Sequence, residues 1–157
     1  MDGTLRDGEV HVGGDARQRF HDSRGYGRPR SGDAIALAPV EAAHLLYRGD
    51  LEAVDGDGFR DFLTAREAGF GPRFLVYVDL RDRGFYLSPA REGWLPEGVE
   101  RSAGEDFMVY PRGQGPWDGE IAHRIRVVGE RTEIPAETLS PGVLAVVDEE
   151  GAVTYLQ

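Results

Sequence analysis

Two reactive residue types, cysteine and lysine, are missing from the sequence. Without cysteine, the 157 residues hold no disulfide bond, thiolate zinc site or cysteine nucleophile. All 18 residues counted as lysine or arginine are arginines, so no lysine can form a Schiff base, clamp a phosphate or stabilise a transition state as a point charge. The four histidines are widely scattered, which disfavours a histidine-rich metal site: His11, His21, His44 and His123. No metal and no cofactor is expected.

Long apolar runs are also missing. No stretch approaches the ~20 apolar residues that a membrane helix needs, and the first residues, MDGTLRDGEVHVGGD, lack the basic and then apolar order of a signal peptide. A soluble, cytoplasmic protein is therefore expected. Hydrophobic residues make up 40% of the sequence, which is enough for the core of one domain or of two small domains.

Basic residues are outnumbered, because 28 acidic residues give the chain a formal net charge of −10. An acidic, lysine-free composition suits a salt-rich cytoplasm, so a halophilic source is expected. The charge disfavours simple electrostatic attachment to nucleic acid. In about 1 M salt, however, the Debye length is only ~3 Å. Local arginines, stacking and shape would then have to carry any recognition of nucleic acid.

The first half of the chain predicts a small mixed domain. Residues 8–13 (GEVHVG) and 34–39 (AIALAP) have the pattern of short strands. Between them, residues 15–25 predict a helix with Asp15 as its N-cap and Gly25 as its stop.

A second helix is predicted from Pro39 to a C-cap at Gly49, with an apolar stripe along one side. His44 lies within it and is interpreted as a structural residue. The DGDG segment, residues 55–58, is interpreted as a surface turn, because most ligand positions of a calcium loop are missing. A short helix is expected after this turn.

The second half of the chain alternates one helix with several strands. Residues 73–84 have apolar side chains at helical spacing and end in a glycine. Strands are predicted at residues 85–90, 106–110 and 122–130, and a hairpin at residues 143–156 around DEEG. The prediction is an α+β (mixed α/β) protein with two domains, residues 1–68 and residues 69–157.

Several of these segments, in this order, resemble the archaeal tRNA-splicing endonucleases. They are DLRDRG, a strand, DFMVYPRG, a histidine, IRVV and VLAVVDEEGAVTY. The N-terminal half adds GYG, a strand and PVEAAHLLYRGD, which resemble the small first domain of that family. More narrowly, the chain is similar to the first, non-catalytic repeat of the double-length haloarchaeal enzymes. The resemblance implies a restriction-endonuclease-like second domain with a mixed sheet.

The resemblance also implies a reaction, a metal-free tRNA-intron lyase cleavage. A tyrosine takes the proton from a ribose 2′-OH, a histidine protonates the departing 5′-oxygen, and a lysine stabilises the charge on phosphorus. The products are a 2′,3′-cyclic phosphate and a 5′-hydroxyl. The positions that match the tyrosine and the histidine are Tyr110 and His123. On a structural interpretation, Tyr110 is instead a strand aromatic and His123 an ordinary residue at a loop edge.

The third position departs from the family pattern. Ser140 or Pro141 stands where the family has its lysine, and Arg124 replaces the serine that commonly follows the histidine. Losing a preorganised charge donor lowers a rate by about a hundredfold to a thousandfold. We therefore favour the structural interpretation, in which a partner carries out the chemistry.

The resemblance assigns such a repeat a docking role. In the family, catalytic and non-catalytic repeats pair through their last strands into dimers or pseudo-tetramers, and an acidic loop enters a basic groove of the catalytic partner. The matching loop here is Asp148, Glu149 and Glu150, and the matching edge strand is residues 152–156. Without the resemblance, DEEG would be interpreted as a solvated turn.

The expected role is therefore to position pre-tRNA with a bulge-helix-bulge motif for a catalytic repeat or subunit. Arg112 and Arg124 are the expected RNA contacts, with Arg28 and Arg30 as further candidates. Two alternatives stay open. One is a self-sufficient RNA-cleaving enzyme that uses Tyr110 and His123, and the other is an assembly module without RNA contact.

Overall fold

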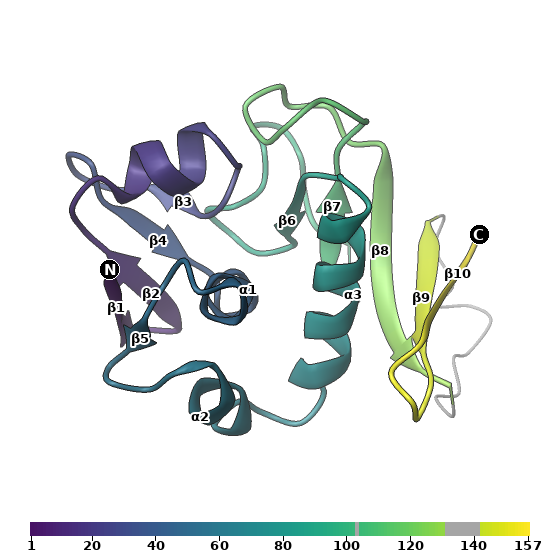
Figure 1. The fold of residues 1–157 in the computed structure, drawn as a ribbon. Coiled ribbons are helices and arrows are strands. Elements are labelled where there is room, and N and C mark those ends of the chain that lie inside the picture. The colour runs from purple at the N-terminus through teal and green to yellow at the C-terminus, as the bar shows by residue number, and fades with distance from the viewer. Residues whose placement is uncertain (103, 131–141) are drawn as a thin grey trace. The chain divides into compact units, whose positions relative to one another are not determined.

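The computed structural model describes residues 1–102, 104–130 and 142–157, and the chain divides into two compact units, Met1–Phe74 and Leu75–Gln157 (Figure 1). Among the described residues, the first unit combines helices with a five-stranded sheet, and the second combines most of one helix with another five-stranded sheet. The predicted α+β class is therefore confirmed. The boundary between the units lies within helix α3 (Phe70–Asp82), whereas the sequence placed it after residue 68.

The first unit contains a sheet with the strand order β3-β4-β2-β1-β5. Its strands are β1 (Asp2–Arg6), β2 (Glu9–Val12), β3 (Arg28–Pro29), β4 (Ile35–Leu37) and β5 (Ala53–Val54). β5 runs parallel to β1, and the other pairs are antiparallel. β2 and β4 lie within the predicted strands 8–13 and 34–39. β1 and β3 were not predicted, because their Asp, Gly and Pro residues have low strand propensity, and β5 was not predicted because it has only two residues.

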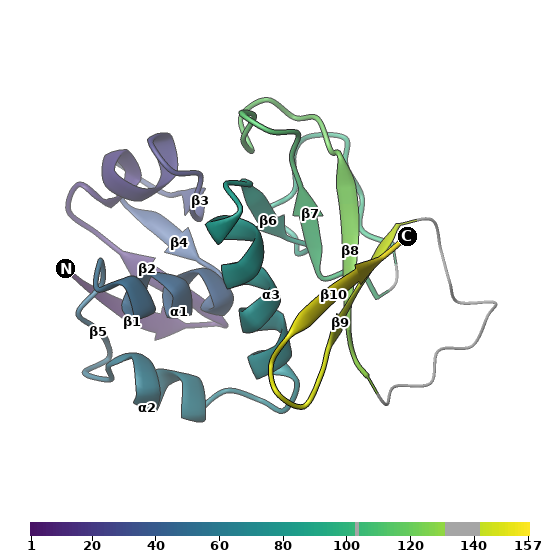
Figure 2. The same ribbon diagram turned by 45° about the vertical axis from the view of Figure 1, so that its right-hand side comes forward.

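Helix α1 (Pro39–Arg48) has the predicted ends. Pro39 is its first residue, and Gly49 has a left-handed φ of 82° with its N–H bonded to the carbonyls of Leu45 and Leu46. The helix contacts β2 and β4, and Figure 2 shows it running across the sheet. Its apolar stripe therefore covers one face of the first sheet.

The GYG segment, residues 25–27, is held against α1 by buried hydrogen bonds. The Tyr26 hydroxyl bonds to Nδ1 of His44 at 2.9 Å, and both side chains are buried. The Glu41 carboxylate, also buried, accepts the N–H groups of Gly27 at 2.6 Å and of Ala38 at 2.9 Å. Gly27 has φ 72°, and a Cβ there would lie 2.6 Å from the Ala36 carbonyl oxygen. His44 is thus a structural residue, as predicted.

The segment between β2 and β3 differs from its prediction. It forms one π-helical turn, η1 (Arg17–Asp22), which has no side-chain cap. The predicted N-cap, Asp15, contributes only its carbonyl, to the N–H of Arg19. Ala16 already has helical backbone angles, so the chain enters the turn without the extended residue on which a side-chain cap depends. Gly25 has a left-handed φ of 73° just beyond the turn, where the stop was predicted.

The DGDG segment lies between β5 and helix α2 (Phe59–Thr64). Asp55 has a positive φ of 51°, and its carboxylate accepts the N–H of Leu5 at 3.1 Å. Asp55, Gly56 and Asp57 are exposed. The segment is therefore a surface turn followed by a short helix, as predicted.

The second unit holds a mixed sheet with the strand order β10-β9-β8-β7-β6. Its strands are β6 (Leu87–Pro89), β7 (Phe107–Val109), β8 (His123–Gly129), β9 (Val143–Val147) and β10 (Val153–Leu156). β8 and β9 are parallel, and the other neighbours are antiparallel. Every predicted strand of this half is present, and β9 and β10 form the predicted hairpin.

Helix α3 covers one face of this sheet (Figures 1 and 2). The ring of Tyr77 packs against Phe107 of β7, with 5.7 Å between centroids. At the other end of the sheet the Tyr155 hydroxyl donates to the Asp79 carboxylate at 2.6 Å. Burial raises the pKa of Tyr155, and the bond to Asp79 raises it further. None of the helices formed by the described residues has the length and apolar character to cross a membrane.

The loop between β6 and β7 is anchored to β8 through two acidic residues. Glu105 accepts the N–H of Ser102 at 2.9 Å and an N–H of Arg124 at 3.0 Å. Asp106 accepts the N–H of Val127 at 2.8 Å. Burial raises the pKa of Glu105, but the hydrogen bonds from Arg124 and Ser102 and the Arg124 charge outweigh it, so the net pKa lies below 4.5.

Replacing Glu41 with alanine should destabilise the fold by about 3 kcal/mol, because the buried N–H groups of Gly27 and Ala38 lose their acceptor. Urea unfolding in high salt measures this free energy. Glu52→Ala is the matched control, since the Glu52 side chain is exposed and should change stability by less than about 0.5 kcal/mol. An equal loss of stability in the two variants would contradict the role of Glu41 in holding the GYG segment against α1.

Glu105→Gln should lower stability by about 2 kcal/mol at pH 7, because it removes a charged partner of Arg124. The folded pKa of Glu105 is lowered, so its contribution is present above pH 4.5 and is lost as the pH falls through the folded pKa. The stability difference from the unsubstituted chain should therefore narrow below pH 4.5 in unfolding curves. A difference that stays constant from pH 7 to pH 3 would refute this account, and exposed Glu97→Gln serves as the control.

Candidate functional site

Tyr110, the first predicted catalytic residue, directly follows β7 and is completely buried. Its hydroxyl shares a 2.7 Å hydrogen bond with Ser88 Oγ, and its N–H donates to the carbonyl of Tyr86. Ser88 belongs to β6, so the tyrosine joins the end of β7 to the neighbouring edge strand. A general base must reach the proton that it removes. In this structure the Tyr110 hydroxyl faces the protein interior instead.

His123, the second predicted catalytic residue, is the exposed first residue of β8. It lines an open hollow of about 510 Å³. The other lining residues are Ile121, Ala122, Arg124, Gly142, Val143 and Gln157. Among the residues that the structure describes, no hydrogen bond orients the imidazole of His123.

The sheet brings Tyr110 and His123 to the same end of the second unit. Val109, which precedes Tyr110, pairs with His123 across β7 and β8. The side chains nevertheless have opposite environments, since Tyr110 is buried and His123 is exposed. The third predicted position, Ser140 or Pro141, lies outside the described residues.

The two predicted RNA-binding arginines differ in their partners. Arg124 donates to the Glu105 carboxylate at 3.0 Å and to the Glu100 carbonyl at 2.9 Å. Arg112 is exposed, donates to the Arg83 carbonyl at 2.9 Å, and lies 4.3 Å from the ring centroid of Phe85. Within the described parts of the chain Arg112 has no carboxylate partner. Arg112 therefore offers more unneutralised charge to an anion than Arg124 does.

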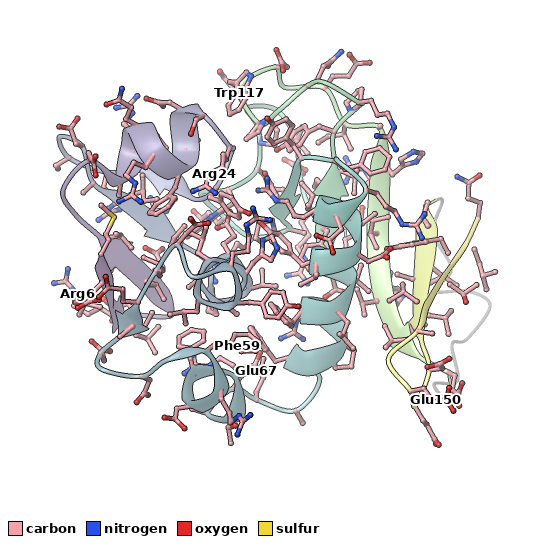
Figure 3. All side chains as sticks on the ribbon, in the orientation of Figure 1. Arg6, Arg24, Phe59, Glu67, Trp117 and Glu150 are labelled. Carbon is pink, nitrogen blue, oxygen red and sulfur yellow. The ribbon has the colours of Figure 1, made fainter. Side chains whose placement is uncertain are left out.

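In the first unit, Arg28 is also paired, since its guanidinium contacts both carboxylate oxygens of Glu9 at 2.8 and 3.0 Å. Arg30 lies with Arg6 and His11 in an open hollow of about 550 Å³, which Asp7 also lines. Figure 3 shows Arg6 at the end of β1, on the outside of its sheet. Arg28 and Arg30 were predicted from the sequence as candidate RNA contacts. Arg6 was not, because only strand pairing brings it to Arg30.

The acidic loop Asp148–Glu150 forms a closed turn between β9 and β10. One oxygen of the Asp148 carboxylate accepts the N–H groups of Glu150 and Ala152, each at 2.9 Å. Gly151, with φ 87°, completes the turn by donating its N–H to the Asp148 carbonyl. Glu149 and Glu150 are exposed, and Figure 3 shows Glu150 at the tip of the hairpin. Asp148 therefore stabilises the turn, and the two exposed glutamates give the tip of the hairpin its negative charge.

Among the strands formed by the described residues, β10 lies at the edge of the sheet and pairs with β9 alone. Leu156 keeps half of its surface exposed, and Leu144 and Val146 of β9 are half-buried. Leu144 pairs with Leu156 and Val146 with Thr154, so these residues share one face of the hairpin. An edge strand with apolar side chains and unpaired backbone groups can pair with another strand.

One exposed aromatic residue escaped the sequence analysis. Trp117 lies in the loop between β7 and β8 and keeps 51% of its surface exposed. Its ring contacts Tyr86, with 5.6 Å between centroids. A tryptophan among glycine, proline and aspartate (GPWDG) was the available signal, because such a segment forms a surface turn.

The first unit matches the model of a known protein family. Residues 1–63 match the family model described as tRNA intron endonuclease, N-terminal domain. This matched segment ends within α2 and contains the GYG segment and α1. The features that the model matches are therefore those that build the first sheet and its helix.

Curated relatives match nearly the whole chain. A tRNA-splicing endonuclease of Haloferax volcanii is 63% identical over 99% of this chain, and one of Halobacterium salinarum is 64% identical over 99%. A tRNA-splicing endonuclease of Methanosarcina acetivorans is 30% identical over the whole chain. The chain spans only 44% of the first two proteins and 46% of the third. The first two sources are haloarchaeal, as the composition predicted. With this similarity along both units, the chain belongs to the tRNA-splicing endonuclease family.

Proposed function

We propose that this chain is the structural, substrate-positioning repeat of a tRNA-splicing endonuclease that cleaves bulge-helix-bulge pre-tRNA. The single observation that carries the proposal is the burial of Tyr110, whose hydroxyl is bonded to Ser88. A catalytic repeat or subunit supplies the chemistry, and the assembled enzyme releases a 2′,3′-cyclic phosphate and a 5′-hydroxyl.

The position of Tyr110 opposes a catalytic role for it. To act on a ribose 2′-OH, the tyrosine would have to leave its bond to Ser88 and move its ring out of the protein core. Both changes are unfavourable, because the ring loses apolar contacts and Ser88 loses its buried partner. Tyr110 instead fastens β6 to the end of β7.

The charges around His123 support the same conclusion. The chain has no lysine, and Arg124 beside His123 is already paired with Glu105. No arginine follows Arg131 in the sequence. A site without its charge donor loses about 3 kcal/mol of transition-state stabilisation, which corresponds to a hundredfold to thousandfold lower rate. These residues suit a supporting repeat better than an independent enzyme.

The β9–β10 hairpin is the proposed docking element. Its tip carries Glu149 and Glu150 on a turn that Asp148 holds closed, and its outer strand, β10, pairs with β9 alone among the strands that the structure describes. A basic groove on the catalytic repeat would receive the tip while a strand of that repeat pairs with β10. Two such pairs would give the dimer or pseudo-tetramer expected from the family resemblance.

The isolated chain should not cleave a labelled bulge-helix-bulge RNA in high salt without metal, and cleavage should appear when a catalytic partner is coexpressed. That partner can be the part of the Haloferax volcanii relative that this chain does not match. Tyr110→Phe should leave the cleavage rate of the assembly within about twofold and lower the stability of the chain by about 1 kcal/mol.

The self-sufficient alternative predicts the opposite pattern. The isolated chain would then cleave the RNA, and Tyr110→Phe or His123→Ala would abolish the activity. Tyr47→Phe is the matched control, because it removes the hydroxyl of an exposed tyrosine outside the second unit. Cleavage by the isolated chain that disappears in Tyr110→Phe but not in Tyr47→Phe would overturn the proposal.

Changing Glu149 and Glu150 together to glutamine should weaken binding to the catalytic partner by roughly tenfold, because the tip loses its charge while Asp148 keeps the turn. Sedimentation of the mixed chains measures the affinity. The matched control is the double change of Glu92 and Glu97, two exposed acids in a different loop, to glutamine. Equal affinities for the tip variant and the unsubstituted chain would remove the docking role from this loop.

A further inference from the structure

Trp117 is held in a fixed position although its ring is exposed. The N–H of Gly115 donates to the Asp118 carboxylate at 2.7 Å, and the N–H of Asp118 donates to the Gly115 carbonyl at 2.9 Å. Pro116 restricts the backbone between Gly115 and Trp117. The turn therefore presents the indole without help from a ligand (Figure 3).

Gly115 also lies directly against the indole. A Cβ on this residue would come within 2.7 Å of Cζ2 of Trp117, so a larger residue would displace the ring. Tyr86, which directly precedes β6, contacts the indole at 5.6 Å between centroids and 64° between ring planes. About half of the indole surface remains exposed after these contacts. A ring that is already immobilised loses little further conformational entropy when a ligand packs on it.

Arginines flank these two rings. The Arg81 guanidinium lies 5.6 Å from the Tyr86 centroid, and Arg112 lies 4.3 Å from the centroid of Phe85, the neighbour of Tyr86. Arg112 is exposed and donates to a carbonyl, so no carboxylate among the described residues neutralises its positive charge. We call Tyr86 and Trp117 the aromatic platform.

Immobilised aromatic rings beside arginine are the groups with which proteins bind unpaired RNA bases. Each unpaired base exposes a π-face that can stack on an indole, whereas a base within a duplex is covered by its neighbours. Stacking also persists in strong salt, where a Debye length of ~3 Å screens the attraction between arginines and distant phosphates. With a net charge of −10, the chain depends on contacts of this short range.

We propose that the exposed indole of Trp117, backed by Tyr86, stacks on one unpaired base of the RNA while Arg112 contacts an adjacent phosphate. This inference rests on the proposed function, because the substrate must be an RNA that contains unpaired bases. It assigns the chain a direct RNA contact, which an assembly module would lack.

The two tryptophans of the chain allow a direct test, because Trp94 is buried and Trp117 is exposed. The chain is produced with 5-fluorotryptophan and assembled with an unlabelled catalytic partner, so that each tryptophan gives one ¹⁹F resonance. A bulge-helix-bulge RNA should shift the Trp117 resonance and leave that of Trp94 in place. A fully paired RNA of equal length should shift neither resonance. A Trp117 shift that appears on adding the partner alone would overturn the proposal in favour of a protein contact.

Affinity measurements on the assembly complete the test. Trp117→Ala should weaken binding of the bulged RNA by about tenfold to a hundredfold, with little change for the paired RNA. Trp117→Phe, which keeps a stacking ring, should recover most of the affinity. Tyr47→Leu is the control, since Tyr47 is an equally exposed ring in the first unit.

The outcomes separate the inference from the proposed function. If the unsubstituted assembly cleaves the bulged RNA but Trp117→Ala binds it with unchanged affinity, the stacking proposal alone is wrong. If the unsubstituted assembly neither binds nor cleaves this RNA, both proposals are wrong.

Discussion

The buried hydrogen bond between Tyr110 and Ser88 constrains the whole second unit. It joins β6 to the end of β7, and β7 in turn positions His123 through the pairing of Val109. Because its ring and hydroxyl are buried, Tyr110 stabilises the junction between these two strands. The proposed non-catalytic role rests on this burial, since a general base has to reach the hydroxyl from which it takes a proton.

Acidic residues in this chain have more than one physical role. Glu41, Glu105 and Asp106 accept backbone N–H groups at places where loops meet helices or strands. Glu149 and Glu150 are exposed at the tip of a hairpin. The first group acts over hydrogen-bonding distance and is largely insensitive to salt, whereas the second acts through charge and is screened. A net charge of −10 is therefore a poor guide to which carboxylates matter for folding.

The helices and long strands could be predicted because local signals mark them. Pro39 and Gly49 mark the ends of α1, and alternating or continuous apolar residues mark β8, β9 and β10. β1 and β3 escaped prediction because Asp2, Gly3 and Pro29 have low strand propensity, and β5 escaped it because its two residues form a strand only through pairing with the distant β1. Asp15 failed as an N-cap because the backbone angles of Ala16, which no side-chain preference reveals, already belong to the helical region.

The candidate site was less predictable than the fold. Family resemblance selected Tyr110 and His123, but burial and exposure, which separate their roles, depend on packing that the sequence pattern does not encode. The GYG segment helped to identify the family, yet its tyrosine and second glycine form hydrogen bonds that hold the segment against α1. Trp117 was missed because a tryptophan in a loop can be buried or exposed, and its position depends on the turn at Gly115 and on the contact with Tyr86.

If the hairpin tip docks as proposed, the Asp148 turn affects how quickly the chain associates with its partner. Its carboxylate already bonds two N–H groups of the hairpin, so the tip has its shape before any encounter. A loop that had to fold during association would make many collisions unproductive and would slow the association rate. With a preformed tip, the association rate depends mainly on orientation and on the short-range electrostatic field that salt leaves in place. For an acidic surface in concentrated salt, such rigidity compensates for the loss of long-range steering.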